Sequence, residues 1–330
     1  MTDDVLHEFA LQMRDAAQTL VDATTPDEVA PPVVDVPVPK PEVTAPPVIV
    51  VDEPDDPDRE PDREPDTPEA PAPVQPDATN SGFLGNSDEL DRHDGRLVIK
   101  TPGQVVQGLA VDGYIDVKAD DVTIEHSTLL TSSAFGIRVY DGFGGLTVRN
   151  VTAHARAEAS TNGVLWPGPG ALVDSCDISG HADGIKLGHR NTVVRNFVHM
   201  TRTPGSDKHL DALQNGVSHL LVACNTLSVP PSVGGNACFI NTTFAGLPPA
   251  GVEILHNWLE GGNYSLYVGK TKNGDCMTGV RVVGNRWFGE EPRYGRVTTG
   301  GCDVWMSDNE LLSEVPMRPL DVDALLNGRA

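Results

Sequence analysis

The most constraining feature of the sequence is an apolar-x-apolar-x-x-Asn phrase that returns about every 20 to 30 residues through the last three-quarters of the chain. Its copies end at Asn150, Asn196, Asn225, Asn257, Asn285 and Asn309, and the interval between the first two is about twice the others. A fixed period of this length is typical of a solenoid, in which each repeat stacks on its neighbour. Each phrase alternates apolar and polar residues and is too short for a helix, so each coil must consist of short strands. The sequence therefore predicts an all-β fold, a parallel β-helix.

A second phrase lies between the copies of the first and sets the alignment of the coils. Its six copies start 27, 21, 28, 25 and 28 residues apart and align without gaps, at Phe135, Asn162, Asp183, Asp211, Asn236 and Tyr264. Because side chains alternate along a strand, we expect the third residue of each copy inside the coil and the second and fourth outside. The predicted inward column contains Ile137, Val164, Ile185, Leu213 and Leu266.

The same alignment predicts two columns of equivalent residues, because equivalent residues of stacked strands lie about 4.8 Å apart. The outward column consists of Arg138, Leu165, Lys186, Gln214, Phe239 and Tyr267. The strand-start column contains Asn162, Asp183, Asp211 and Asn236. Side chains from different coils are therefore expected to meet on one face of the solenoid.

The coil that begins at His209 carries a family resemblance. His209-Leu-Asp211-Ala-Leu-Gln214, followed by a strand and Asn225-Thr226, resembles a His-x-Asp-Gly-Ile-Gln, strand, Asn-Thr coil of the pectate-lyase-like superfamily. That coil is common in actinobacterial and actinobacteriophage members. The resemblance covers roughly residues 95–312 and implies a single-stranded right-handed parallel β-helix of a phage minor tail or tail-spike-like protein. It implies no single activity, because the superfamily contains lyases, hydrolases, epimerases and inert adhesion fibres.

The first 80 residues differ in composition from the rest. They contain 20 acidic and 4 basic residues, and 16 of the 27 prolines lie between Pro26 and Pro76. Such a segment cannot form a packed core. We expect four parts: an amphipathic helix over residues 1–24, a disordered acidic linker over 25–80, the β-helix over 81–315 and a C-terminal tail or cap over 316–330. The helix either docks the chain onto other phage tail proteins or assembles a homotrimer; a frayed segment without a role is the alternative.

Targeting signals and cysteines bear on where the chain works. Residues 1–25 are acidic and lack a secretory signal, and no run approaches the roughly 18 apolar residues of a membrane span. We therefore expect a virion protein that lysis releases and that acts at the host cell surface; a truncated start is the alternative. Three of the five cysteines fall within strands and are expected to be buried: Cys176, Cys224 and Cys238. Cys276 and Cys302 lie one coil apart, a separation that allows a disulfide, although we do not expect one before lysis because a cytoplasm keeps thiols reduced.

Titratable side chains concentrate on two coils that the alignment makes neighbours. It places His181 over His209, Asp183 over Asp211 and Lys186 beside Gln214. A uronic-acid lyase needs a base to remove the proton next to the carboxylate and a cation or metal to stabilise the resulting charge. The candidate catalytic residues are Asp183, Lys186, His189, His209 and Asp211, with Lys186 or His189 as the base. Arg190 or Arg138 is the candidate cation, and Asp183 and Asp211 are candidate ligands of Ca²⁺.

Two other interpretations of these residues remain open. Asp183 and Asp211, about 5 Å apart on neighbouring rungs, have the separation of a retaining glycosidase pair. Alternatively, the strand-start column only caps turns, because stacked Asx side chains hydrogen-bond the backbone of the next coil. The candidate substrate-binding residues are Arg138, Asn162, His181, Arg190, Gln214, Phe239 and Tyr267.

The sequence thus fits an enzyme or a binding protein. The enzyme is a depolymerase that cleaves a host surface polysaccharide by elimination or hydrolysis, either on a phage tail or as a secreted or cellular protein. The binding protein is a catalytically silent fibre that recognises envelope glycan. A net charge of −23 argues against a nucleic-acid partner, which needs a basic stripe.

Overall fold

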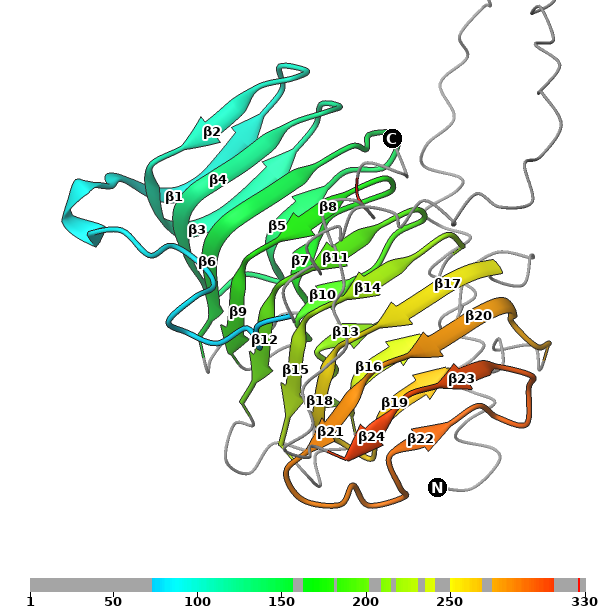
Figure 1. Cartoon of the computed structure of the whole chain (residues 1–330). Helices are drawn as coiled ribbons and strands as arrows, with labels where there is room; N and C mark the ends of the chain where they lie inside the picture. The colour runs from blue at the N-terminus through cyan, green and yellow to red at the C-terminus, as the bar shows by residue number, and fades with distance from the viewer. Residues whose placement is uncertain are drawn as a thin grey trace, which may run out of the picture. The chain divides into compact units, whose positions relative to one another are not determined.

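The computed structural model describes residues 73–156, 163–180, 183–201, 209–214, 218–230, 235–240, 250–268, 275–311 and 326, without the side chain of Phe239. The predicted helix of residues 1–24, most of the predicted linker and all of the C-terminal segment except Leu326 lie outside this part. Within it, 24 strands join in one sheet, and the pairings between named strands are parallel (Figure 1). A single 3-10 turn, η1 (Ser87–Glu89), precedes the first strand. No helix of the described part is long and apolar enough to cross a membrane.

Each coil contributes strands to three faces, which the pairing of successive coils defines. Face 1 consists of the second halves of β1 (Asp91–Ile99) and β3 (Leu109–Val117), then β5 (Phe135–Val139), β7 (Gly163–Trp166), β10 (Ile185–Lys186), β13 (Leu213–Gln214), β16 (Asn236–Ile240), β19 (Tyr264–Val268) and β22 (Val297–Thr298). Face 2 consists of β2 (Val105–Gln107), the first halves of β4 (Thr123–Thr131) and β6 (Thr147–Ala155), then β8 (Leu172–Asp174), β11 (Thr192–Val194), β14 (Leu221–Ala223), β17 (Ala250–Leu255), β20 (Thr278–Val283) and β23 (Trp305–Ser307). Face 3 consists of the remaining halves of β1, β3, β4 and β6, then β9 (Asp177–Gly180), β12 (Phe197–Met200), β15 (Thr226–Val229), β18 (Trp258–Gly261), β21 (Arg286–Phe288) and β24 (Glu310–Leu311).

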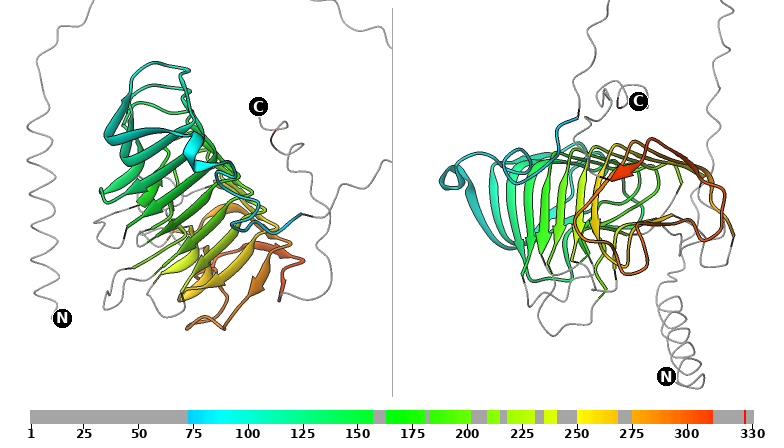
Figure 2. Two further views of the ribbon diagram at one scale, coloured as in Figure 1. Left: turned by 90° about the vertical axis from the view of Figure 1, so that its left-hand side faces the viewer. Right: turned by 60° about the horizontal axis from the view of Figure 1, so that its bottom comes forward.

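The prediction of an all-β solenoid is confirmed, since equivalent strands of successive coils lie side by side along the molecule (Figures 1 and 2). The core is the apolar interior enclosed by the three faces. Its largest fully buried side chains belong to the inward positions of the repeats, among them Ile137, Ile185, Leu213 and Leu227. An aliphatic side chain at each of these positions gains about 1.5–3 kcal/mol from leaving water, so the repeat itself supplies the stability of the fold.

The predicted inward column is right for four of its five members and wrong for Val164. Ile137 and Ile185 both pair with Leu165, which is 1% exposed, so Leu165 is the inward residue of its coil. Val164 stands one position earlier and is also buried. The second position of each copy proves to be an inside position as well: a Cβ on Gly184 would lie 2.7 Å from a side-chain carbon of Val198, across the coil on face 3. Strict alternation therefore fails where the strand enters face 1.

The Asn phrases form a ladder at the corner between faces 2 and 3. The backbone N–H of each asparagine donates to the Oδ1 of the next, over 2.9–3.0 Å, through Asn196, Asn225, Asn257, Asn285 and Asn309. The side-chain amides also donate to backbone carbonyls of the preceding coil, as Asn225 does to Val193. Asn150 is the exception. It has a φ of +50° and occupies the left-handed corner position that Ser175, Arg195 and Cys224 fill in later coils.

Cys276 and Cys302 form a disulfide with a Cα–Cα distance of 5.4 Å, which is the pairing that their separation of one coil allows. The 26-residue separation places them on successive coils at the C-terminal end of the described solenoid. The other cysteines are buried and unpaired as disulfides, as predicted. Burial raises the pKa of the thiols of Cys176 and Cys224 to about 12, so these groups are neutral and unreactive at neutral pH.

Replacing Cys276 and Cys302 together by serine is expected to lower the free energy of unfolding by about 2–4 kcal/mol, because the disulfide restricts the unfolded chain. Denaturant titration under oxidising conditions measures this difference. Adding a thiol reductant to the native protein should reproduce the loss, and the double variant should not respond to the reductant. An equal response of both proteins would show that the disulfide does not form.

Candidate functional site

The outward column on face 1 consists of the outward strand positions of eight successive coils. Its members follow from the strand register and are Asp116, Arg138, Trp166, Lys186, Gln214, Phe239, Tyr267 and Thr298. Leu165 was predicted in this column, but Trp166 takes its place because of the one-residue shift described above. The column therefore carries a large aromatic ring directly beside Lys186.

The strand-start column caps the backbone, as the structural interpretation of these residues predicted. Asp183 Oδ1 accepts the backbone N–H of Asp211 at 2.9 Å, and Asp211 Oδ1 accepts that of Asn236 at 2.7 Å. Asn236 Oδ1 in turn accepts the N–H of Tyr264 at 3.1 Å. One oxygen of each side chain is thus committed to holding coils together.

The second oxygen of each aspartate faces the outward column and joins a charged cluster. Lys186 Nζ lies 2.8 Å from Asp183 Oδ2 and donates also to Gln214 Oε1. Gln214 Nε2 donates to Asp211 Oδ2 at 2.7 Å, and His209 Nδ1 lies 3.1 Å from the same oxygen. The structure therefore unites five of the predicted catalytic and binding residues in one network.

Burial differs sharply across this cluster. The side chain of Asp211 is fully buried and that of Lys186 is 13% exposed, whereas that of His209 is 50% exposed. Burial, and next the negative charge of Asp211, raise the pKa of Asp183 above its ordinary value. The hydrogen bond to Asp211 raises the pKa of His209. His209 is therefore the group of the cluster that solvent or a ligand reaches most easily.

This arrangement suits proton transfer by His209. A carboxylate at Nδ1 fixes the orientation and tautomer of the ring and makes it a stronger base, as in hydrolytic triads. The Lys186 ammonium supplies positive charge beside it. The geometry does not support a retaining glycosidase. The side chain of Asp211 is fully buried and accepts a hydrogen bond from the backbone N–H of Asn236, so it cannot reach a sugar carbon.

The donor set does not fit the predicted Ca²⁺ site. Asp183, His209 and Asp211 offer one atom each within 4.8 Å of one another. Calcium prefers six to eight oxygen ligands, whereas this set includes a nitrogen. The Lys186 ammonium also occupies the position beside Asp183 Oδ2 where a cation would bind. Lys186 contacts the carboxylate of Asp183 and His209 contacts that of Asp211, so protein side chains occupy the positions where a metal ion would balance their charge.

The remaining predicted site residues lie elsewhere or outside the described part. Arg138 is two rungs from Lys186 and donates to the buried Asp116 at 3.0 Å. His189 and Arg190 follow the strand and are exposed at the turn toward face 2, away from the cluster. Tyr267 is half-buried in the outward column. Asn162, His181 and the side chain of Phe239 lie outside the described residues.

The sequence did not predict a second polar group on face 1, which surrounds Asp116. Asp116 accepts hydrogen bonds from Arg96 at 2.7 Å, from Arg138 and from the Tyr140 hydroxyl at 3.2 Å. Arg138 also lies over the rings of Phe135 and Tyr140. The sequence does contain a pattern that predicts the position of Asp116. Ile115-Asp116-Val117 has the same form as Ile137-Arg138-Val139 of the next coil, which places Asp116 in the outward column beside Arg138.

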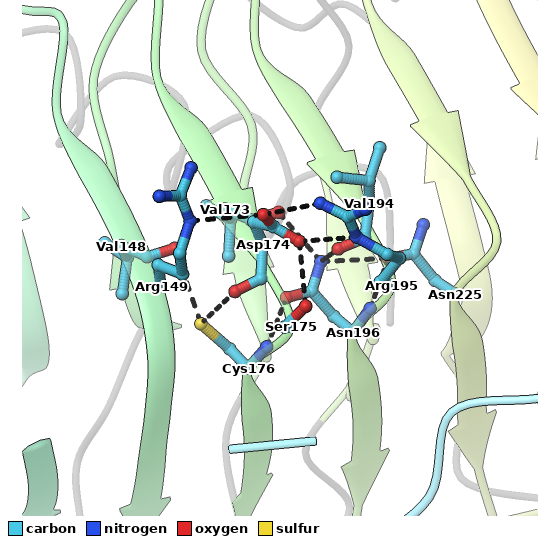
Figure 3. A network of polar contacts seen from close by, with 10 residues as sticks. All are labelled: Val148, Arg149, Val173, Asp174, Ser175, Cys176, Val194, Arg195, Asn196 and Asn225. Atoms are coloured by element: carbon cyan, nitrogen blue, oxygen red, sulfur yellow. Dashed lines mark hydrogen bonds and ion pairs between the residues drawn. The ribbon is translucent and has the colours of Figure 1, made fainter. Parts of the chain in front are cut away.

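A third polar network, centred on Asp174, is structural (Figure 3). The side chain of Asp174 is 3% exposed and receives Arg195 at 2.8 and 2.9 Å, Arg149 at 3.3 Å and the Ser175 hydroxyl at 2.9 Å. Figure 3 shows the two guanidinium groups on opposite sides of the carboxylate, from neighbouring coils. The network ties three coils together beside the Asn ladder.

No protein-family model, curated protein or solved structure matches this chain. The geometry of face 1 is therefore the basis for assigning a function.

Proposed function

We propose that the chain binds a polysaccharide along the outward column of face 1 and that the polysaccharide is a glycan of the host cell envelope. The observation that carries this proposal is the straight column of outward positions, which places Arg138, Trp166, Lys186 and Gln214 on consecutive rungs and Tyr267 two rungs after Gln214. Consecutive rungs are about 4.8 Å apart, so the column offers regularly spaced contacts to a linear polymer.

The chemistry of the column supports a sugar ligand. Aromatic rings present an apolar face against the C–H face of a sugar, while amide, guanidinium and ammonium groups donate to hydroxyl and carboxylate oxygens. Trp166 is half-buried and its ring lies 5.0 Å from that of Phe135, which fixes its position. Tyr267 is held in the same way, 6.1 Å from Tyr264. A ligand therefore meets aromatic surfaces that are already ordered.

Replacing Trp166 or Tyr267 by alanine is expected to weaken retention of the polysaccharide about tenfold, because each removes a large apolar contact. Affinity electrophoresis against extracted host envelope polysaccharides measures the effect. Trp305→Ala is the matched control, since Trp305 is 67% exposed on face 2. Equal weakening by the Trp305 variant, or no retention of any envelope polysaccharide, would contradict the proposal.

A second candidate function is cleavage of the bound polysaccharide by β-elimination, favoured by the contact of His209 with Asp211 beside Lys186. His209 would remove the proton at C5 of a uronate. The electron pair would form the C4=C5 double bond as the C4–O bond breaks, and the departing oxygen would take a proton from water. The ammonium of Lys186 would stabilise the charge that develops on the carboxylate.

We also propose the setting that the sequence resemblance implies, a phage tail protein that meets its host. The acidic, Pro-rich composition of residues 25–80 supports this setting, because such segments extend up to about 3.1 Å per residue and serve as spacers. The Cys276–Cys302 disulfide supports a working place outside a reducing cytoplasm. Attachment through residues 1–24 and a homotrimeric assembly are parts of the same proposal.

A further inference from the structure

A hollow of about 640 Å³ opens beside the outward column, at the turn from face 1 to face 2. Three aromatic residues line it: Tyr140, Phe143 and Trp166. Trp166 belongs both to this hollow and to the column, one rung from Lys186. A polymer that follows the column therefore passes the mouth of the hollow.

Glycines from three successive coils are among the residues that line the hollow. They are Gly142 and Gly144, then Gly168, then Gly188. At Gly188 a side chain is impossible without a backbone shift, because its Cβ would lie 2.2 Å from the carbonyl oxygen of Gly168. Glycine at this position therefore lets two successive coils pack closely where they line the hollow.

The walls are fixed by contacts that a ligand does not need to form. The Tyr140 hydroxyl donates to Asp116 and accepts from Arg138 at 2.5 Å, and Lys118 Nζ lies 4.1 Å from the centre of the Tyr140 ring. Trp166 is held against Phe135. Ordered walls reduce the conformational entropy that binding would cost.

The polar groups of the hollow define what it would bind. Asp120 and Asp141 line it, both exposed, together with the exposed His189. Asp120 Oδ1 accepts the backbone N–H of Gly144 at 2.8 Å and so stays in place. Carboxylates accept hydrogen bonds from sugar hydroxyls but repel the carboxylate of a uronate. The rings of Phe143 and Trp166 match the apolar face of a pyranose, whereas Lys118 and Arg138 lie over the ring of Tyr140.

We propose that this hollow is a subsite for an uncharged sugar residue, adjacent to the position that Lys186 defines for a uronate. The inference rests on the proposed polysaccharide-binding function and extends it. It implies a polymer in which an uncharged unit or side branch neighbours each acidic unit. Lys186 selects the negatively charged sugar unit. Asp120 and Asp141, which line the hollow, select against a negative charge there.

The test uses the full chain and ligand-observed and protein-observed NMR with methyl glucoside, methyl galactoside, N-acetylglucosamine and glucuronate as probes. At least one uncharged sugar should bind and shift the indole N–H signal of Trp166, and glucuronate should bind about fivefold more weakly because of the two carboxylates. Asp141→Asn should reduce this discrimination. Phe143→Ala should weaken the uncharged sugar about tenfold, and Asp303→Asn, an exposed site elsewhere, should change neither result.

The outcomes separate this subsite from the proposed function. One outcome would overturn the subsite alone: the polysaccharide is retained and Tyr267→Ala weakens this retention, but no monosaccharide shifts the indole N–H signal of Trp166. Binding of glucuronate as tight as that of the uncharged sugars would overturn its specificity. Binding of an uncharged sugar at Trp166 without retention of any polymer would support the subsite and contradict the polymer-binding column. Thermal melting of each variant excludes loss of folding as the cause.

Discussion

Replacing Ile185 by aspartate is expected to abolish folding of the solenoid. Ile185 is fully buried between Leu165 and Leu213 of the neighbouring coils. An ionised carboxylate there has no partner, and the penalty for burying it exceeds the net stability of about 5–15 kcal/mol that a folded domain has. The measurement is circular dichroism together with thermal unfolding of the purified variant.

Ile185→Val is the matched control. It removes one methyl group and should lower the free energy of unfolding by only about 1 kcal/mol. If the aspartate variant folded with a melting transition close to that of the native protein, the inward column and the register of face 1 would both be wrong.

The second large effect concerns the candidate cleavage reaction. If the chain cleaves a uronate-bearing envelope polysaccharide, ultraviolet absorbance of the unsaturated ends measures the rate. His209→Ala and Lys186→Ala are each expected to lower this rate about 100-fold or more, the usual contribution of a positioned base or cation. His199→Ala is the matched control, because His199 also contacts an aspartate, Asp177 at 2.8 Å, but on face 3.

The pH dependence gives an independent check of the base. Because Asp211 raises the pKa of His209 above 6.5, the rate should rise with pH to a midpoint above 6.5, where the ring loses its proton. Asp211→Asn keeps an oxygen for the backbone of Asn236 but removes the charge, and should move this midpoint to lower pH. New reducing ends without absorbance would indicate hydrolysis instead. A complete absence of cleavage alongside retention of polysaccharide would leave the column as a binding surface.

The same pKa shift has a consequence for stability with a defined sign. A histidine with a raised pKa in the folded state binds its proton more tightly there than in the unfolded chain. The contribution of the His209–Asp211 contact is therefore complete below pH 6.5 and is lost as the pH rises through the folded-state pKa.

The repeat alone determined the class of fold. Each copy of the Asn phrase has alternating apolar residues, and it can bury them only by stacking on the other copies. The repeat is therefore sufficient to assign Asn196, Asn225 and Asn257 to one corner of the coil. The cluster of Asp183, Lys186, His209, Asp211 and Gln214 followed from the same logic, because a correct alignment of two coils makes their side chains neighbours.

Two features were decided only by the tertiary structure. One is the register of β7, and the other is which side chains of the cluster are buried and which are exposed. Asn162-Gly163 imitates Asp183-Gly184 in sequence, but the stacked Gly168 and Gly188 set the alignment one residue later and put Trp166 in the column. Local sequence does not resolve such a shift, because both alternatives bury apolar side chains. Likewise, burial of Asp211 and exposure of His209 depend on how neighbouring coils cover each side chain, and this depth decides which group can act as a base.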